Sequence, residues 1–113
     1  VARRSITEGV VPMAKHATFW RMKVKPGQVN ALTALTCPAV EAEMKARGWE
    51  MDITGVSKNN PDEVWGAVLW DTSERYYANA ESPEQNASYE KMRALLAEDP
   101  EWFDCDLLAE NRA

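Results

Sequence analysis

The segment from Glu63 to Trp70, EVWGAVLW, constrains the fold more than any other part of this chain. Successive side chains of a β-strand point to opposite faces of a sheet. Both faces of this strand are apolar, with Val64, Gly66, Val68 and Trp70 on one and Trp65, Ala67 and Leu69 on the other. Because helices in a small domain cover only one face, something else has to bury the second. We therefore expect a homodimer that packs sheet against sheet.

The remaining elements follow from periodicity, since alternating apolar residues indicate strands and three- and four-residue steps indicate helices. We expect strands over 16–25, 50–57, 63–70 and 105–110, and helices over 28–47, 71–80 and from Ser82-Pro83 onward. Pro38 should kink or restart the first helix, and Gly48 should cap its end. We interpret Trp102 and Phe103 as part of a last helical turn capped by Asp99-Pro100-Glu101.

This β-α-β-β-α-β order predicts an α+β fold of the ferredoxin-like, split βαβ kind. In this fold one four-stranded antiparallel sheet carries both helices on one face, and two copies would form an α/β barrel. We expect residues 13–113 to form one domain. Residues 1–12 are interpreted as an N-terminal tail outside the fold, either disordered or non-native.

Charge and composition narrow the classes of partner. The chain has 18 acidic and 13 basic residues, a net charge of -5, and no basic run beyond Arg3-Arg4, so we do not expect nucleic-acid binding. Cys37 and Cys105 fit no metal-binding spacing, and we interpret both as small buried groups in a reducing compartment. No apolar run approaches the roughly 18 residues that span a bilayer, so we expect a cytoplasmic protein without a membrane partner.

Several local patterns together resemble the antibiotic biosynthesis monooxygenase family of dimeric α/β barrel proteins. They are the alternating first strand followed by Pro26-Gly27, the amphipathic helix, the hairpin, and the runs VLWDTSERYY and SPEQNA. The strongest mark is a strand that ends in Trp70, followed by a capped helix carrying Tyr76. The resemblance covers about residues 14–110, and it implies a dimer with a pocket between sheet and helices or inside the barrel.

Members of that family oxidise polyketide quinols without a cofactor, degrade haem, isomerise lactones, or have no known activity. The quinol oxygenases carry an Asn four positions before the strand-ending Trp, where this chain has Gly66. The haem-degrading members carry a Trp and an iron-ligating His at the positions of Asn79 and Tyr89. The resemblance therefore does not imply haem degradation, and we expect neither a cofactor nor a metal.

Six residues are candidates for a site. His16, Arg21 and Tyr76 are candidate catalytic groups, and Trp70, Tyr89 and Phe19 are candidate substrate contacts. His16 or a tyrosine would act as the base, Arg21 would hold a developing anion, and Trp70 would pack against a substrate ring. Each has a structural alternative. Trp70 and Tyr76 would be core, Arg21 would pair with Glu63 or Asp52, and His16 would be a solvated residue at a strand end.

Two functions from different classes remain open. One is a small cofactor-independent monooxygenase or isomerase that acts on an aromatic or enolisable molecule. The other is a non-catalytic dimeric module that binds a small molecule or only itself. Convergence of Arg21, Tyr76 and either His16 or Tyr89 on one cavity would favour the enzyme. A salt-bridged Arg21 and a ring-filled space between sheet and helices would favour the module.

Overall fold

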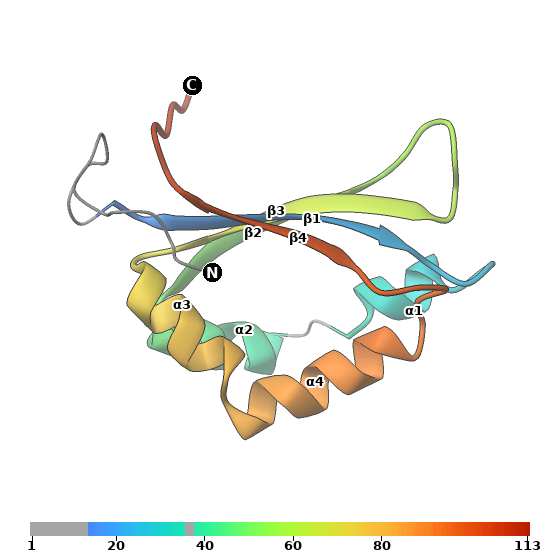
Figure 1. Cartoon of the computed structure of the whole chain (residues 1–113), viewed down its shortest axis with the longest axis horizontal. Helices are drawn as coiled ribbons and strands as arrows, with labels where there is room; N and C mark the ends of the chain where they lie inside the picture. The colour runs from blue at the N-terminus through green and yellow to red at the C-terminus, as the bar shows by residue number, and fades with distance from the viewer. Residues whose placement is uncertain (1–13, 36–37) are drawn as a thin grey trace.

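The structure is a computed structural model, and it describes residues 14–35 and 38–113. Four antiparallel strands form one sheet in the order β2-β3-β1-β4, and all the labelled helices lie on one side of it (Figure 1). The elements are β1 (His16–Lys23), α1 (Val29–Thr33), α2 (Pro38–Arg47), β2 (Trp49–Val56), β3 (Glu63–Trp70), α3 (Ser73–Ala80), α4 (Pro83–Arg93) and β4 (Glu101–Asp106). The predicted ferredoxin-like α+β fold is confirmed.

Short polar signals set the ends of the helices. The predicted restart at Pro38 is confirmed, because α1 and α2 are separate helices. Gly48 follows α2 with a φ of 119°, a left-handed conformation that suits a glycine at a helix end. Ser82 caps α4 by accepting a hydrogen bond from Gln85 N at 3.1 Å, as its position before Pro83 predicts.

The cap of α3 differs from expectation by one residue. The sequence predicts a helix over 71–80, but Thr72 has the extended backbone of an N-cap and accepts a hydrogen bond from Arg75 N at 3.1 Å. Asp71 instead forms an ion pair with the Arg75 side chain at 2.8 Å. Both are acceptors that a helix start favours, so the residue type alone does not decide between them.

The predicted position of the last strand is wrong. Strand β4 spans Glu101–Asp106 rather than 105–110, and Trp102 and Phe103 lie within it instead of in a helical turn. Pairing with β1 decides this, because Trp102 lies opposite Trp20 and Phe103 lies opposite Phe19. Cross-strand aromatic pairs of this kind stabilise the register of a sheet.

The apolar core lies between the sheet and the helices. Its buried centre consists of Met22, Val24, Val64 and Leu96, with Trp20, Val29, Leu32 and Met92 packed around it. Strand β1 runs through the middle of the sheet between β3 and β4, and it brings Met22 into this centre. The side of the sheet under the helices is called the covered face below.

The opposite side of the sheet, here called the open face, is apolar and accessible. Its exposed side chains are Phe19 (47%), Ile53 (63%), Trp65 (49%) and Phe103 (52%). These residues come from all four strands, so they form one patch across the sheet. The expected second apolar face is thus present, whereas the dimer that would bury it stays a prediction.

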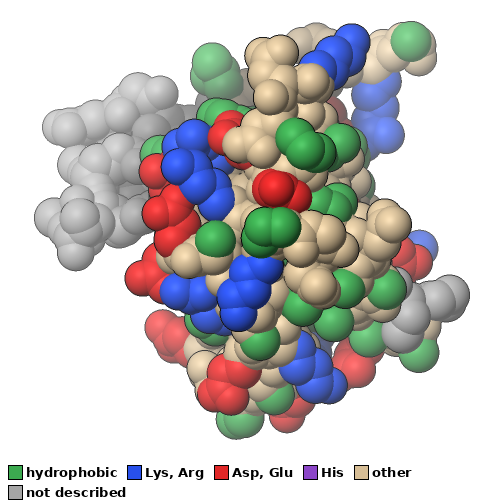
Figure 2. All heavy atoms as spheres, turned by 90° about the vertical axis from the view of Figure 1, so that its right-hand side faces the viewer, with side chains coloured by type: hydrophobic (Ala, Val, Ile, Leu, Met, Phe, Trp, Pro, Cys, Tyr) green, Lys and Arg blue, Asp and Glu red, His purple; other side chains and the backbone are tan. Residues whose placement is uncertain are grey.

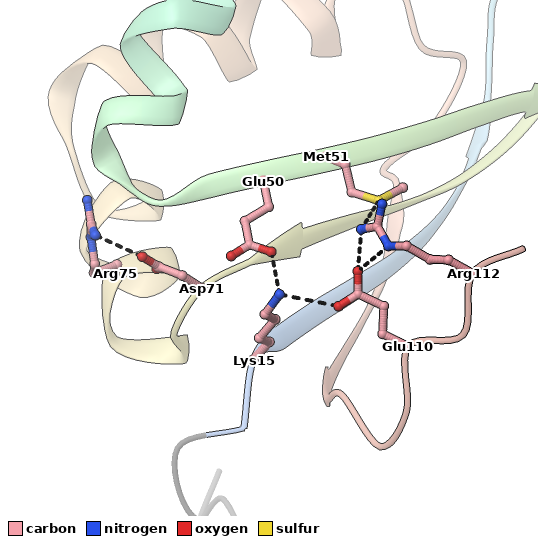
Figure 3. A network of polar contacts seen from close by, with 7 residues as sticks. All are labelled: Lys15, Glu50, Met51, Asp71, Arg75, Glu110 and Arg112. Atoms are coloured by element: carbon pink, nitrogen blue, oxygen red, sulfur yellow. Dashed lines mark hydrogen bonds and ion pairs between the residues drawn. The ribbon is translucent and has the colours of Figure 1, made fainter.

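The chain after β4 crosses one end of the open face, where the C-terminus lies in Figure 1. Lys15 holds this segment, because its Nζ donates to Glu50 of β2 at 2.8 Å and to Glu110 at 3.2 Å (Figure 3). Arg112 forms an ion pair with Glu110 and reaches the sulfur of Met51. The terminal segment therefore forms a wall against the sheet.

Surface charges are mixed in sign. On the side of the molecule that Figure 2 shows, basic and acidic side chains are interspersed rather than gathered by sign. Within residues 14–35 and 38–113, no group of three or more His, Cys, Asp or Glu side chains could hold a metal ion. No helix in the described part of the chain is long and apolar enough to cross a membrane. Cys105 is only half-buried, contrary to expectation, and Cys37 lies outside the described residues.

Candidate functional site

A polar cluster lies under α3 at the start of β1. His16 is 1% exposed and Thr18 is fully buried, and both point to the covered face. The expectation that His16 is a solvated strand end is therefore wrong. The sequence places His16 at the first position of a strand, but it does not show that α3 lies over this end of β1. Strand β4 contributes Asp104, which lies opposite Thr18 in the sheet register.

Hydrogen bonds join these groups into one chain. His16 Nδ1 lies 3.0 Å from Ser73 Oγ, and His16 Nε2 lies 2.7 Å from Thr18 Oγ1. Thr18 Oγ1 donates to Asp104 Oδ1 at 2.8 Å. On its other oxygen, Asp104 accepts a hydrogen bond from the Tyr77 hydroxyl at 2.9 Å. Both ring nitrogens of a buried imidazole thus have polar partners, as burial of a polar ring requires.

Aromatic rings surround the imidazole. The Tyr76 ring stacks on His16 with centroids 4.0 Å apart, and Trp70 meets Tyr76 edge to face at 5.9 Å. Tyr77 contacts both Tyr76 and His16 at its edge. Burial raises the pKa of the Tyr76 phenol, a hydrogen bond with Thr18 opposes that rise, and the charge of Asp104 adds to it. Tyr76 is therefore held in its neutral, hydrogen-bonding form.

Trp20 fills the space next to this cluster where the resemblance placed an amide. A Cβ built on Gly66 would lie well inside van der Waals contact of both the Trp20 indole and the backbone oxygen of Ile53. The indole and this backbone oxygen together favour a glycine at this position, and a larger residue such as asparagine would displace the indole. Trp20 therefore occupies the space beside Gly66 in which a side chain at that position would lie.

Arg21 and Phe19 lie on the open face, away from His16. The Arg21 guanidinium makes two hydrogen bonds with Glu63, at 3.1 and 3.2 Å, and lies 5.4 Å from the centre of the Trp65 ring. It also reaches Glu101 at 3.5 Å. The ion pair with Glu63 is one of the two alternatives that the sequence leaves open. Arg21 therefore does not converge with the histidine and tyrosine.

The structure brings together three of the six candidate residues: His16, Trp70 and Tyr76. Tyr89 lies half-buried on α4, the neighbouring helix. Sequence reasoning missed Thr18, Asp104 and Ser73 as members of the cluster. A signal for Thr18 was present, because it is a polar residue on the same strand face as Trp20 and Met22, and a polar group there needs a partner.

Asn79 has a structural role. By the resemblance described above, it occupies the position at which the haem-degrading monooxygenases carry a Trp. It is 7% exposed, its side-chain oxygen accepts from Arg47 at 3.1 Å, and its amide donates to Gln85 at 3.2 Å. These bonds tie α2, α3 and α4 together. A shallow hollow of about 290 Å³ lies beside it, and the two arginines that line it already pair with Glu43 and Asp71.

A second hollow lies on the open face beneath the terminal segment. Its volume is about 370 Å³. Apolar side chains of the sheet form its floor and the terminal segment forms one wall, with Phe19, Met51, Ile53, Leu69 and Leu107 among the lining residues. Such a hollow suits a small apolar molecule, and it lies on the opposite side of the sheet from His16.

No family model matches this sequence, and no curated protein matches it either. Solved structures do match. One from Chloroflexus aurantiacus, provisionally named an antibiotic biosynthesis monooxygenase, is 23% identical, with 88% of this chain and 98% of that chain covered and a TM-score of 0.69. Another of the same provisional name, from Caulobacter crescentus, is 15% identical, covers 86% and 92%, and has a TM-score of 0.71.

SnoaB from Streptomyces nogalater, described as a cofactor-independent oxygenase and solved as a point mutant, is also similar. It is 13% identical, with 86% of this chain and 96% of that chain covered and a TM-score of 0.69. Each of these structures is covered nearly end to end, so the likeness extends to the whole domain and not to one motif. This chain therefore has the fold of the antibiotic biosynthesis monooxygenase structures.

Proposed function

We propose that this chain is a small monooxygenase-like enzyme that removes a proton from an aromatic or enolisable molecule without a cofactor. The observation that carries the proposal is the buried imidazole of His16, stacked on Tyr76 and hydrogen-bonded at both nitrogens. A base held in this way has a fixed orientation and a dry environment, which general-base catalysis exploits. The similarity to a cofactor-independent oxygenase supports the reaction class.

The chemistry needs little from the protein. Once the substrate loses a proton, its stabilised carbanion can combine with dioxygen and take a proton to give a hydroperoxide. Loss of water from that hydroperoxide leaves a carbonyl, so one oxygen atom stays in the product and the other leaves as water. Tyr76, kept neutral by its raised pKa, can donate a hydrogen bond to the developing anion. Arg21 has no part in this proposal because it lies on the open face.

Oxygen consumption with a panel of dihydroxyaromatic compounds tests the enzyme. We expect uptake by the unmodified protein and a loss of about 10²-fold or more in kcat for His16→Gln, the usual scale of a general base. Arg21→Ala is the matched control and should keep kcat within about threefold, because its side chain is remote from the cluster. Absence of uptake above a heat-inactivated sample across the panel would remove the oxygenase proposal.

A second candidate is a non-catalytic module that binds a small apolar molecule on the open face. It is favoured by the 370 Å³ hollow beneath the terminal segment and by the ring-filled space near Gly66. In that case an apolar probe such as naphthalene sulfonate would bind and raise the melting temperature without being consumed. Binding that survives Ile53→Lys would contradict this candidate, since Ile53 lines the hollow.

We also propose that the open face is the interface of a homodimer. Four large apolar side chains there are about half exposed, and a continuous apolar patch of this kind in water favours association. Light scattering at micromolar concentration should give twice the monomer mass, and Ile53→Lys should reduce it to the monomer. Val40→Lys is the matched control, because Val40 is similarly exposed but lies on α2. A monomer mass for the unmodified protein would contradict the dimer.

A further inference from the structure

The positions of the protons in the His16 cluster follow from its hydrogen bonds. As a carboxylate, Asp104 can only accept, and its two oxygens receive the hydroxyl protons of Thr18 and Tyr77. The single hydroxyl proton of Thr18 is therefore committed to Asp104. Thr18 Oγ1 can only act as an acceptor toward His16, 2.7 Å away.

The imidazole must then carry its proton on Nε2 and donate it to Thr18. In the neutral ring this leaves Nδ1 as an acceptor, and the atom that faces it is Ser73 Oγ at 3.0 Å. One tautomer therefore satisfies the whole chain of hydrogen bonds from Ser73 to Asp104.

We propose that Ser73, His16, Thr18 and Asp104 form a proton relay, with Ser73 Oγ as the atom that exchanges a proton with the substrate. This inference rests on the proposed function and extends it. His16 is 1% exposed and cannot touch a substrate directly, whereas Ser73 is half-buried at the first residue of α3. Ser73 Oγ is thus the accessible atom through which the buried Nδ1 of His16 can take up a proton.

Each step of the relay moves one proton between hydrogen-bonded atoms. The substrate gives a proton to Ser73 Oγ as the Ser73 hydroxyl proton passes to His16 Nδ1. His16 Nε2 then passes its proton to Thr18 Oγ1, whose own proton moves to Asp104 Oδ1. The substrate is left as an anion and Asp104 becomes a carboxylic acid, so charge and protons balance. The Asp104 side chain is partly exposed, so that proton can be released to solvent.

Asp104 also supports the intermediate state of the relay. Its Oδ1 lies 3.9 Å from His16 Nε2, close enough to stabilise an imidazolium once Nδ1 takes up a proton. Thr18 and Asp104 are positioning residues in this scheme, because they act on the substrate only through His16. In a catalytic triad an acidic group also orients the imidazole. Here Thr18 lies between Asp104 and His16, so the two arrangements share this chemistry but not the direct contact.

The first test needs no substrate. The chain has a single histidine, so the nitrogen-15 spectrum of labelled full-length protein reports His16 alone. We expect the neutral ring to be protonated at Nε2, and we expect Ser73→Ala to shift the Nδ1 resonance by removing its donor. Thr18→Ser should retain the tautomer and Thr18→Val should lose its preference. Protonation at Nδ1 in the unmodified protein, or a Nδ1 resonance that ignores Ser73→Ala, would overturn the relay.

The second test uses the dihydroxyaromatic compound that gives the fastest oxygen uptake. Ser73→Ala and Thr18→Val should lower kcat about 10²-fold with little change in KM, while Ser73→Thr and Thr18→Ser should recover most of it. If the two hydroxyl groups had only a structural role, the hydroxyl-bearing variants would not differ in kcat from the other two. Equal losses of kcat in all four variants would overturn the relay. If no compound is oxidised, the proposed function fails while the nitrogen-15 spectrum still decides the relay.

Discussion

The two faces of the sheet use the same four strands in opposite ways. On the covered face, Trp70 is 1% exposed and the polar groups of His16 and Thr18 are matched by partners from β4 and α3. On the open face, Trp65 is 49% exposed, and the charged pair of Arg21 and Glu63 lies beside its ring. The covered face is buried within a single chain, whereas the open face is apolar and accessible to solvent.

This difference separates the roles of similar residues. The contribution of a tryptophan, a glycine or a charged group to stability depends on the face of the sheet on which it lies. Alternation along the strand decides which face that is. Residues of one type on the two faces therefore provide matched pairs for experiment. Changes on the covered face should have the larger effects, and changes on the open face the smaller ones.

Replacing a tryptophan should matter far more on the covered face. Trp70→Ala removes a fully buried ring, and we expect the free energy of unfolding to fall by about 3–5 kcal/mol. Trp65→Ala removes a half-exposed ring, and the expected loss is below about 1 kcal/mol at protein concentrations where the chain is monomeric. Urea denaturation of both variants measures the comparison, and similar losses would contradict the difference between the faces.

Two glycines of neighbouring strands give a second pair. Gly66→Ala places a methyl group against the Trp20 indole, and we expect a loss of about 1–3 kcal/mol from overpacking. A methyl group on Gly55 would meet no atom of the described residues within 4 Å, so Gly55→Ala should change stability by no more than about 1 kcal/mol. Thermal denaturation compares them. A Gly66→Ala protein as stable as Gly55→Ala would show that the indole yields easily.

Alkaline pH should affect the covered face through Tyr76. Its folded-state pKa is raised, mainly by burial, above the value of about 10 expected in the unfolded chain. The neutral phenol is thus favoured in the folded protein, and this contribution is present below about pH 10 and is lost as pH rises through the folded-state pKa. Stability measured from about pH 8 to 11 should fall less in Tyr76→Phe than in the unmodified protein. Parallel curves would contradict this origin of the pH dependence.

Acid pH should affect the open face, with the smallest effect of the four. The Arg21 guanidinium, chiefly through its hydrogen bonds, lowers the pKa of Glu63 below its ordinary value, and Trp65 adds to this. The pair stabilises the fold above the unfolded-state pKa of about 4.3, and that contribution is lost as pH falls through the folded-state value. Arg21→Ala should make the denaturation midpoint less sensitive to pH between about 5 and 3. An unchanged slope would show that solvent screens the pair completely.

Sequence patterns predicted the elements whose signals are local. Strand β3 has the expected bounds, and the Ser82-Pro83 start of α4 is confirmed, because alternation and capping act between residues close in sequence. Strand β4 was misplaced because Trp102 and Phe103 follow a strong turn signal, and only their partners on β1 show that they extend a sheet. Those partners lie at the other end of the chain.

The candidate site was predicted in part for the same reason. His16 and Tyr76 were chosen for their chemistry, and their stacking is a fact of the tertiary structure. Thr18 and Asp104 are 86 residues apart, so their hydrogen bond has no local signature. Arg21 was expected to have either an ion-pair or a ligand-binding role, and its strand face allowed both until the position of Glu63 was known.

The alternation along β1 also has a consequence for how such a chain can change. His16 and Thr18 lie on the covered face, while Ala17 and Phe19, at the alternate positions, lie on the open one. Substitutions can therefore alter either face alone. An insertion or deletion of one residue within the strand would exchange the two sets, sending the histidine into the apolar patch and the phenylalanine under α3. Variation in natural or engineered relatives should thus enter this strand by replacement, with changes of length confined to the loops at its ends.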